Sequence, residues 1–230
     1  MRTLGLIGGM SWESTAIYYR LLNRLARERL GGLHSARLIL WSVDFAEIAA
    51  LQASGDWDGL TARMEEAGAA LRRAGAEAVV ICTNTMHRMA AEVEAAAGLP
   101  LIHIADVTAA ACVDAGVRRP ALLATRYTME QDFYRERLRA GGVNPITPDD
   151  AGRTLVHRII YEELCQGIVR DESRAAYLEL IETLRRDGAD GVILGCTEVG
   201  LLIGPEHTDL PVFDTTALHC AAALDFALAG

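Results

Sequence analysis

Short apolar runs alternate with longer amphipathic stretches along this chain of 230 residues, and this alternation constrains its fold more than any other feature. Apolar runs of this length fit strands that are buried on both faces, and the amphipathic stretches fit helices that cover a sheet. Strands interleaved with helices are typical of βαβ units with a parallel sheet, so we predict an α/β fold. The expected strands are Thr3–Ile7, Arg37–Val43, Ala78–Cys82, Leu101–Ile104, Ala121–Ala124, Gly191–Leu194 and Pro211–Phe213, and the expected helices include Ser14–Arg29, Asp58–Arg73, Met129–Arg139, Arg174–Arg186 and Thr216–Leu228.

A weak internal repeat indicates two similar halves. Ala76–Asn84 resembles Ala189–Glu198, and Leu6–Met10 resembles Leu122–Arg126. Both pairs have the same order and an offset of about 115 residues, which favours duplication over a chance likeness between βαβ units. We predict two pseudosymmetric α/β domains, 1–105 plus 214–230 and 106–213, each with a mainly parallel four-stranded sheet and with the active site in the cleft between them.

Composition excludes several classes of partner. The formal net charge is −9 and the sequence pI is near 5.2, which argues against nucleic acid, because phosphate backbones are bound by positive fields. No apolar run approaches the roughly 20 residues that a membrane helix needs, and the first residues do not resemble a secretory signal. We therefore expect a cytoplasmic protein that binds neither nucleic acid nor a membrane.

All basic residues are arginine, so the chain has no lysine. Pyridoxal phosphate enzymes need a lysine amine for their Schiff base, which excludes that chemistry, and the phosphate-binding lysine of a P-loop is missing as well. The five cysteines are widely spaced, without a Cys-x-x-Cys motif, which argues against a disulfide framework or a zinc site. We expect no cofactor and no metal, and cysteines that serve in packing or in catalysis.

Two of these cysteines stand where catalysis would be expected. Cys82 and Cys196 each end a predicted buried strand in the two copies of the repeat, and each is followed by a threonine. Ligands bind beyond the carboxyl ends of strands in open α/β sheets, and backbone N–H groups near a helix start stabilise a thiolate. A thiol with a pKa near about 8.5 can serve as base or as acid, so two thiols across a cleft can move a proton from one face of a carbon to the other. Either cysteine alone would more often be a packed core residue.

These residues resemble a known family. Cys82–Thr85 and Gly195–Glu198 resemble the two signatures of the aspartate/glutamate racemase family, and Gly5–Thr15, Thr125–Met129 and Phe213–Thr215 extend the likeness over nearly the whole chain. The chain is especially similar to the enterobacterial amino-acid racemases of L-aspartate and L-glutamate. The resemblance implies a pyridoxal-independent two-base racemase with two pseudosymmetric domains, frequently a homodimer.

The resemblance also implies roles for individual residues. Cys82 and Cys196 would be the acid–base pair. The α-carboxylate and amine of a small amino-acid substrate would be held by Thr83, Asn84, Thr85 and Thr197. Met10 and Ser11 would line the site from the first loop, and Thr125 and Thr128 from its counterpart. From its position we add Glu198 as a group that polarises a neighbour or binds the substrate ammonium, and Gln52 at the rim.

One position departs from the family pattern. Aspartate racemases often have a lysine for the distal carboxylate of the substrate in a stretch that here reads Ile160–Gly167, and Cys165 stands at its place. A site for a second carboxylate should present a cation, because an unpaired buried charge is costly. We therefore expect broad or neutral amino-acid specificity as well as the aspartate/glutamate type.

The combined prediction is an amino-acid racemase that inverts the α-carbon with two cysteines. One alternative is an isomerase or a decarboxylase of a small diacid on the same fold. Another is a two-lobed binding module for a small molecule, with redox-active thiols.

Overall fold

The computed structural model describes residues 1–229 and divides the chain into two compact units. Unit 1 comprises Met1–His103 and the chain from His219 on, and unit 2 comprises Ile104–Leu218. The sequence predicts a division close to this one, into 1–105 plus 214–230 and 106–213. The helix that follows His103 packs its first residues, Ile104 and Ala105, into the core of unit 2.

The elements of unit 1 alternate as the sequence pattern indicates. They are β1 (Leu4–Gly8), α1 (Trp12–Leu30), β2 (Leu38–Ser42), α2 (Phe45–Ser54), α3 (Trp57–Arg73), β3 (Ala78–Ile81), η1 (Thr85–Met89), α4 (Ala90–Ala97) and most of α10 (Thr215–Leu228). Those of unit 2 are α5 (Ile104–Asp114), β4 (Ala121–Ala124), α6 (Arg126–Glu130), α7 (Asp132–Ala140), α8 (Asp150–Glu162), η2 (Leu164–Gln166), α9 (Asp171–Arg186), β5 (Val192–Gly195), η3 (Thr197–Leu201), η4 (Pro205–His207) and β6 (Val212–Asp214).

Each unit contains a parallel sheet, which confirms the predicted α/β class. Within residues 1–229 the strand orders are β2-β1-β3 and β4-β5-β6. Leu4 of β1 is in register with Leu38 of β2 and Ala78 of β3, and Ala121 of β4 is in register with Val192 of β5. Parallel neighbours end at the same sheet edge, so the loops after β1 and β3, and those after β4 and β5, lie next to each other.

Each described sheet has three strands and a fourth segment reduced to one bridge, so the predicted four-stranded sheets are a correction. In the described residues, Leu101 bridges Val79 and Ile146 bridges Ala121, both in parallel. Leu101 follows a proline, and Ile146 lies between Pro145 and Pro148. A proline has no N–H to donate, so the ladder cannot continue through Pro100 before Leu101 or through Pro148 after Ile146. When the bridges are included, both units have the same order, with the first strand between the second and third and the fourth beside the third.

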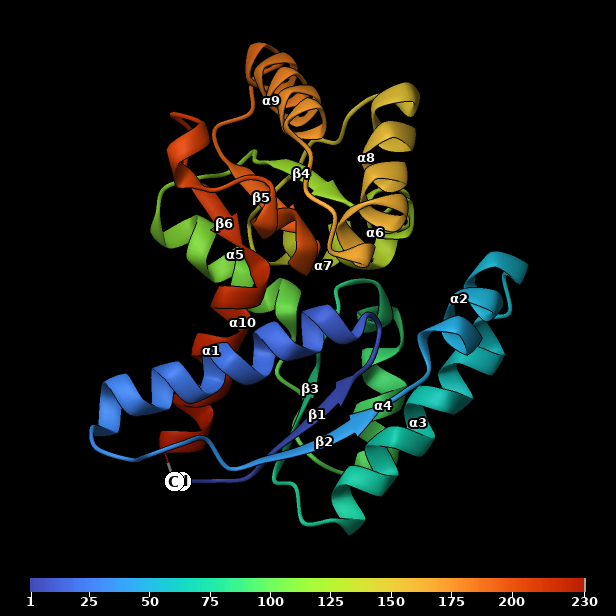
Figure 1. Ribbon diagram of the computed structural model, residues 1–230, viewed down its shortest axis with the longest axis vertical. Coiled ribbons are helices and arrows are strands. Elements are labelled where there is room, and N and C mark those ends of the chain that lie inside the picture. The colour runs from blue at the N-terminus through green and yellow to red at the C-terminus, as the bar shows by residue number, and fades with distance from the viewer. Residues whose placement is uncertain (230) are drawn as a thin grey trace. The chain divides into compact units, whose positions relative to one another are not determined.

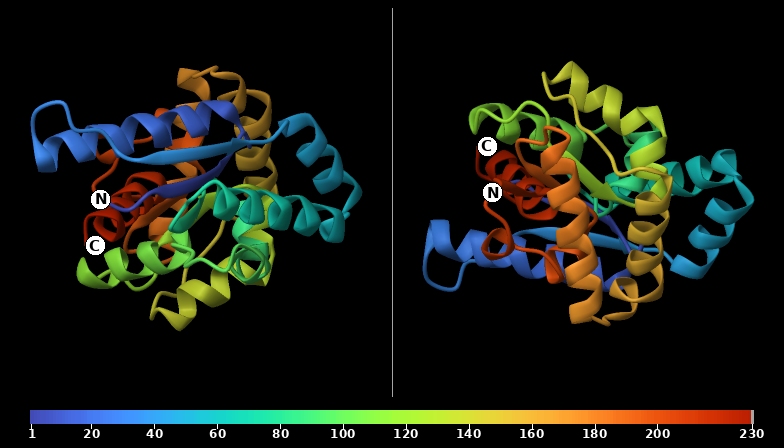
Figure 2. Two further views of the ribbon diagram at one scale, coloured as in Figure 1. Left: turned by 90° about the horizontal axis from the view of Figure 1, so that it is seen from below. Right: turned by 90° about the horizontal axis from the view of Figure 1, so that it is seen from above.

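Side chains alternate between the two faces of the unit 1 sheet, as the pleat requires. Leu6 and Val80 pack against α1 and α10, whereas Ile7 and Ile81 pack against α2, α3 and α4 (Figure 1). The start of the chain and the end of α10 lie side by side (Figure 2), and the backbone N–H of Arg2 donates to the carbonyl of Ala227 at 2.8 Å. This arrangement places α10, the last helix of the chain, in the core of unit 1.

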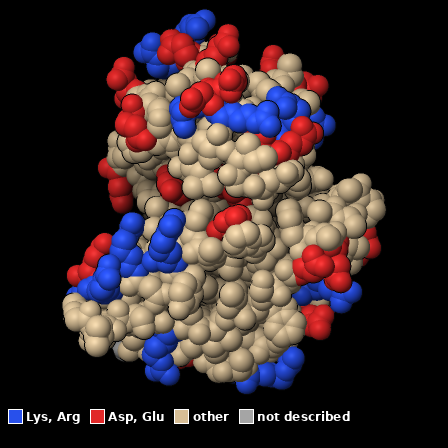
Figure 3. Space-filling model, in the orientation of Figure 1, with Lys and Arg blue, Asp and Glu red and all other residues tan. Residues whose placement is uncertain are grey.

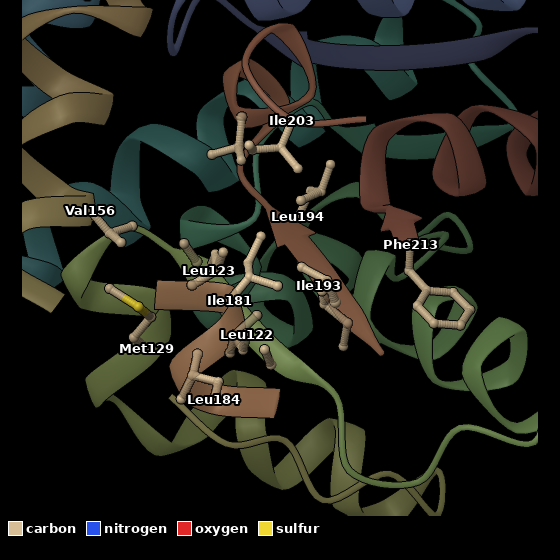
Figure 4. Close-up of a cluster of buried hydrophobic side chains, with 14 of the residues drawn as sticks. Leu122, Leu123, Met129, Val156, Ile181, Leu184, Ile193, Leu194, Ile203 and Phe213 are labelled. Atoms are coloured by element: carbon tan, nitrogen blue, oxygen red, sulfur yellow. The ribbon is translucent and has the colours of Figure 1, made fainter. Parts of the chain in front are cut away.

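The core of unit 2 is one continuous cluster around its sheet. Side chains of β4, β5 and β6 pack against side chains of α6, α8 and α9 in the close-up of Figure 4, which labels Leu122, Leu123, Met129, Val156, Ile181, Leu184, Ile193, Leu194, Ile203 and Phe213. Each fully buried side chain of this type contributes about 1.5–3 kcal/mol by burial. The sheet of unit 2 therefore has a packed core of its own.

Charged side chains of both signs lie together on the surface over α9 (Figure 3). Glu182 pairs with Arg185 at 2.7 Å and with Arg186 at 3.6 Å. Exposed pairs like these contribute little to stability. In the described part of the chain, no helix combines the length and the apolar character that crossing a membrane requires.

Candidate active site

Cys82 directly follows β3 and continues its pairing. Its backbone N–H donates to the carbonyl of Ile7 at 2.9 Å, and its side chain points to the same sheet face as Ala78 and Val80. The residue is 1% exposed, and its thiol lies 3.9 Å from the carbonyl oxygen of Val80. Burial raises the pKa of the Cys82 thiol, because a thiolate loses its hydration there. The thiol is therefore protonated unless a bound ligand changes its surroundings.

The loop after Cys82 turns at once into η1. The backbone N–H of His87 donates to the carbonyl of Asn84 at 3.2 Å, and its ring Nδ1 lies 2.7 Å from the carbonyl of Thr83. Asn84 and Thr85 are buried, whereas Thr83 is half-buried. These bonds fix the polar residues directly behind the cysteine.

Gln52 reaches this loop from α2. The residue is buried, and its Nε2 lies 3.5 Å from the sulfur of Met86 in η1. The structure thus brings Gln52, which we expected at the rim of a site, to the segment that carries Cys82.

The loop after β1 lies at the same sheet edge. Met10 and Ser11 are both buried, and the Ser11 hydroxyl caps α1 by accepting from the N–H of Ser14 at 3.5 Å. Gly9 has φ +90°, and a Cβ there would lie 2.2 Å from the carbonyl of Val43. Glycine is therefore required for this turn. We call Met10, Ser11, Gln52, Cys82, Thr83, Asn84 and Thr85 the Cys82 half-site.

In unit 2, Cys196 follows β5 at the equivalent point of the fold and precedes η3. Its Sγ lies 3.0 Å from Oε2 of Glu198, and the Sγ of Cys165 lies 3.8 Å from Oε1 of the same carboxylate. Glu198 is 3% exposed, and Thr197 is also buried. Burial, and then the negative charge of Glu198, raises the pKa of the Cys196 thiol. Burial raises the pKa of Cys165 too.

The loop after β4 completes this edge of unit 2. Thr125 caps α6 by accepting from the N–H of Thr128 at 3.4 Å, and the two hydroxyl oxygens lie 3.2 Å apart. Both threonines are buried. We call Thr125, Thr128, Cys165, Cys196, Thr197 and Glu198 the Cys196 half-site. Every predicted site residue thus lies at the carboxyl edge of a sheet or, for Gln52, against the loop there.

Sequence reasoning missed one contact within the Cys196 half-site and one residue beside the Cys82 half-site. It identified Cys165 as a departure from the family pattern and not as a neighbour of Glu198, from which it is separated by 33 positions. It also omitted His219, which packs against His87 with ring centroids 5.5 Å apart. Pairing of a thiol with a distant carboxylate has no local sequence signal.

The fold places the chain among α/β proteins in which a cysteine follows an equivalent strand of each of two parallel sheets, β3 and β5. A family model described as Asp/Glu/Hydantoin racemase matches residues 7–223, and the chain belongs to this family. This membership confirms the predicted enzyme class, an isomerase that acts on amino acids.

Three relatives illustrate the likeness. A crystal structure of a protein from Yersinia pestis, assigned as an Asp/Glu racemase, is 55% identical with a TM-score of 0.92 and covers 99% of this chain and 100% of that chain. An aspartate racemase homologue from Pyrococcus horikoshii OT3 is 34% identical with a TM-score of 0.86, and 99% of each chain is covered. The broad specificity amino-acid racemase RacX of Bacillus subtilis strain 168 is 22% identical over 162 residues, 70% of each chain.

Proposed function

We propose that this chain inverts the α-carbon of an amino acid without a cofactor, using Cys82 and Cys196 as its two acid–base groups. The observation that carries the proposal is the matched position of the two cysteines. Each directly follows the strand that pairs with the first strand of its sheet, β3 with β1 and β5 with β4, and each lies beside a capped loop with buried hydroxyls. Equivalent positions in two similar units are a simple way to supply matched groups for the two faces of one carbon.

In the proposed reaction, one cysteine is a thiolate and the other a thiol. The thiolate takes the α-proton and becomes S–H, which leaves the electron pair on the carbon. The other thiol then gives its proton to the opposite face and becomes the thiolate. Exchange with solvent resets the pair. Atoms and charge balance, and the substrate's configuration decides which cysteine acts as the base.

Substrate binding would fall to the polar groups around each thiol. Thr83, Asn84, Thr85 and Thr197 would bind the α-carboxylate and the amine, with Met10, Ser11, Gln52, Thr125 and Thr128 around them. Glu198 would accept a hydrogen bond from the Cys196 thiol and polarise it, or face the substrate ammonium. Oriented donors of this kind also stabilise the negative charge that develops at the carboxylate.

We propose that the accepted side chains are broad and include neutral ones. Cys165, a neutral thiol, stands where related aspartate racemases often have a lysine. The Bacillus subtilis relative is a broad specificity racemase, which supports this. The assignment of the Yersinia relative as an Asp/Glu racemase, and of the Pyrococcus relative as an aspartate racemase homologue, supports acidic substrates instead. A panel of both enantiomers of aspartate, glutamate, homoserine and alanine would separate these ranges.

The decisive experiment follows the α-hydrogen. Each enantiomer is incubated with the protein in deuterated water, and Cα deuteration is read by NMR while inversion is read by chiral chromatography. A racemase gives both. A decarboxylase releases carbon dioxide from a diacid without inverting an amino acid, and a binding module gives no exchange. Absence of inversion across the panel contradicts the proposal.

We further propose that the enzyme works as a homodimer in the cytoplasm, with halves near residues 1–105 plus 214–230 and 106–213. Sedimentation analysis at catalytic concentrations tests the dimer, and a monomer that retains full activity contradicts it.

A further inference from the structure

The carboxylate of Glu198 lies between two thiols in unit 2. Cys196 approaches Oε2 at 3.0 Å, and Cys165 approaches Oε1 at 3.8 Å. A thiol has one hydrogen to donate and a carboxylate only accepts, so both sulfurs are donors here. The proposed reaction uses Cys196 and gives the second donor, Cys165, no part in the transfer of the proton.

The turn that carries Cys165 is firmly held. Glu163, which is 5% exposed, accepts from the hydroxyl of Ser173 at 2.6 Å through its side chain. Its carbonyl accepts from the backbone N–H groups of Gln166 at 2.9 Å and Ile168 at 3.0 Å. These bonds lie on both sides of Cys165 in the sequence. The backbone on both sides of Cys165 is therefore held by hydrogen bonds, and this fixes the side chain of Cys165 beside Glu198.

When two donors bind one carboxylate, each hydrogen bond is weaker than it would be alone, because both donors compete for the same negative charge. If the Cys165 donor is removed, the carboxylate holds the Cys196 hydrogen more strongly. The Cys196 thiol then gives up its proton less readily. Cys165 thereby affects Cys196 through the carboxylate of Glu198.

We propose that Cys165 is a positioning residue that acts on Cys196 through Glu198. Its thiol donates to one oxygen of the Glu198 carboxylate, and this weakens the hydrogen bond that the carboxylate accepts from the Cys196 thiol. The catalytic consequence of this proposal rests on the proposed function, whereas its effect on the Cys196 thiol does not.

Two tyrosines also lie beside this cluster. Tyr161 of α8 and Tyr177 of α9 interact electrostatically with both thiols, and Tyr161 also with Glu198. Burial raises the pKa of both tyrosines, so they stay neutral over the pH range in which a cysteine is usually titrated. Glu198 is thus the charged group through which Cys165 is expected to act.

The test measures the thiol itself. Wild type, Cys165→Val and Cys165→Ser are treated with iodoacetamide from neutral to alkaline pH, and alkylation of Cys196 is quantified by peptide mass spectrometry. In Cys165→Val we expect the midpoint of Cys196 reactivity to rise by about one pH unit, which is about tenfold slower alkylation below the midpoint. Serine keeps a donor, so Cys165→Ser should stay closer to wild type. Cys112→Val, at a buried cysteine of the same unit, is the matched control and should leave Cys196 unchanged.

A double-mutant cycle tests whether Cys165 affects Cys196 through Glu198. Glu198→Gln removes the charge and should lower the midpoint of Cys196, and Cys165→Val added to it should give no further shift. An equal shift from Cys165→Val in both backgrounds overturns the proposal, as does a Cys165→Val protein that matches wild type. If Cys165→Val and Cys165→Ser shift the midpoint of Cys196 reactivity equally, Cys165 does not act as a hydrogen-bond donor.

Catalysis supplies an independent readout. Cys165→Val should lower kcat about tenfold at neutral pH and recover at alkaline pH, with KM within about twofold of wild type. A merely structural role would lower activity at every pH without moving the profile, and that result overturns the proposal. If the wild type racemises no amino acid, the proposed function fails, and the alkylation cycle still decides the role of Cys165.

Discussion

The two half-sites place a cysteine at the same point of the fold and surround it with different chemistry. Cys82 lies on an apolar sheet face, and its thiol is 3.9 Å from the carbonyl of Val80. Cys196 faces the carboxylate of Glu198 at 3.0 Å. The βαβ topology therefore determines where each thiol stands, and the neighbouring side chains determine how readily it loses its proton.

The loop of Cys82 is connected instead to three buried histidines, His87, His103 and His219, which we call the histidine cluster. The ring centroid of His87 lies 4.7 Å from that of His103 and 5.5 Å from that of His219. His103 is the residue at which the chain leaves unit 1, and His219 is the residue at which it returns. The cluster therefore joins the Cys82 loop to both of these crossing points, whereas the Cys196 half-site has an acidic partner.

The largest expected effect tests whether the two thiols are equivalent. Cys82→Ala and Cys196→Ala should each reduce inversion of both enantiomers by about 10²–10⁴-fold, because each removes one of two obligatory proton carriers. The remaining thiol can still exchange the α-hydrogen that faces it, so each variant should deuterate one enantiomer without inverting it, and the two variants should choose opposite enantiomers.

The same assay sharpens the comparison. Exchange by Cys196, whose thiol donates a hydrogen bond to Glu198, is expected to differ in pH dependence from exchange by Cys82. A single alanine variant that inverts at a near-normal rate would show that its cysteine is not a base, and Cys112→Ala is the control for loss of a buried thiol.

The next largest effect concerns acid stability, which should arise on the Cys82 side. The Nε2 of His219 lies 2.7 Å from the carbonyl of Ile102, which only accepts, so Nε2 carries the hydrogen and Nδ1 accepts from the hydroxyl of Tyr18 at 2.8 Å. Burial lowers the pKa of His219 from 6.5 to about 4. The unfolded chain binds more protons between these values, so stability is full above pH 6.5 and falls as the pH drops toward about 4.

The contribution of His219 to this loss is about 3 kcal/mol. In His219→Gln, whose amide can still donate and accept, unfolding free energies measured by denaturant titration should vary less with pH over the same window. His34→Gln, at an exposed histidine, is the matched control and should keep the wild-type slope. An unchanged slope in His219→Gln would contradict the assignment of a buried neutral imidazole.

Local pattern predicted the fold where tertiary context agreed with it. The strand Ala121–Ala124 has the predicted bounds, and the helix expected at Thr216–Leu228 begins one residue earlier. The apolar run Leu101–Ile104 was expected to be a strand, yet Ile104 begins α5, because an apolar run this short fits a strand and a buried helix start equally well. Helix α8 was missed where the chain continues from the proline-bounded Ile146.

The parts of the candidate site that have a local sequence signal were also predicted, and the long-range contacts were not. A cysteine at the end of a buried strand is visible in the sequence, and both cysteines were found. The bond between Tyr18 and His219 spans 201 positions, and that between Cys165 and Glu198 spans 33. Such contacts follow from which helix packs on which sheet face, and a single sequence does not encode them as spacing.

A smaller effect compares one hydrogen bond from each unit. Tyr18→Phe removes the donor to the neutral His219 ring, and we expect it to cost about 1 kcal/mol. Ser173→Ala removes the 2.6 Å donor to the buried Glu163 carboxylate, and we expect about 2 kcal/mol, since bonds to charged groups contribute more. Denaturant unfolding measures both. A greater loss from Tyr18→Phe would indicate that the histidine cluster is more tightly coupled to its surroundings than the hydrogen bond between Ser173 and Glu163 in unit 2.

The smallest effect compares the two helix caps. Ser11 caps the 19-residue helix α1 through the N–H of Ser14 at 3.5 Å, whereas Thr125 caps the five-residue α6 and also contacts the hydroxyl of Thr128 at 3.2 Å. A cap satisfies one of four free N–H groups at a helix start, and a short helix has few other bonds to hold it. Alanine at either position should cost about 1 kcal/mol or less, with Thr125→Ala the more costly. If both residues also bind substrate, KM should rise in both variants by more than the stability loss explains, and Ser11→Asp, which keeps a capping oxygen, should restore stability without restoring KM.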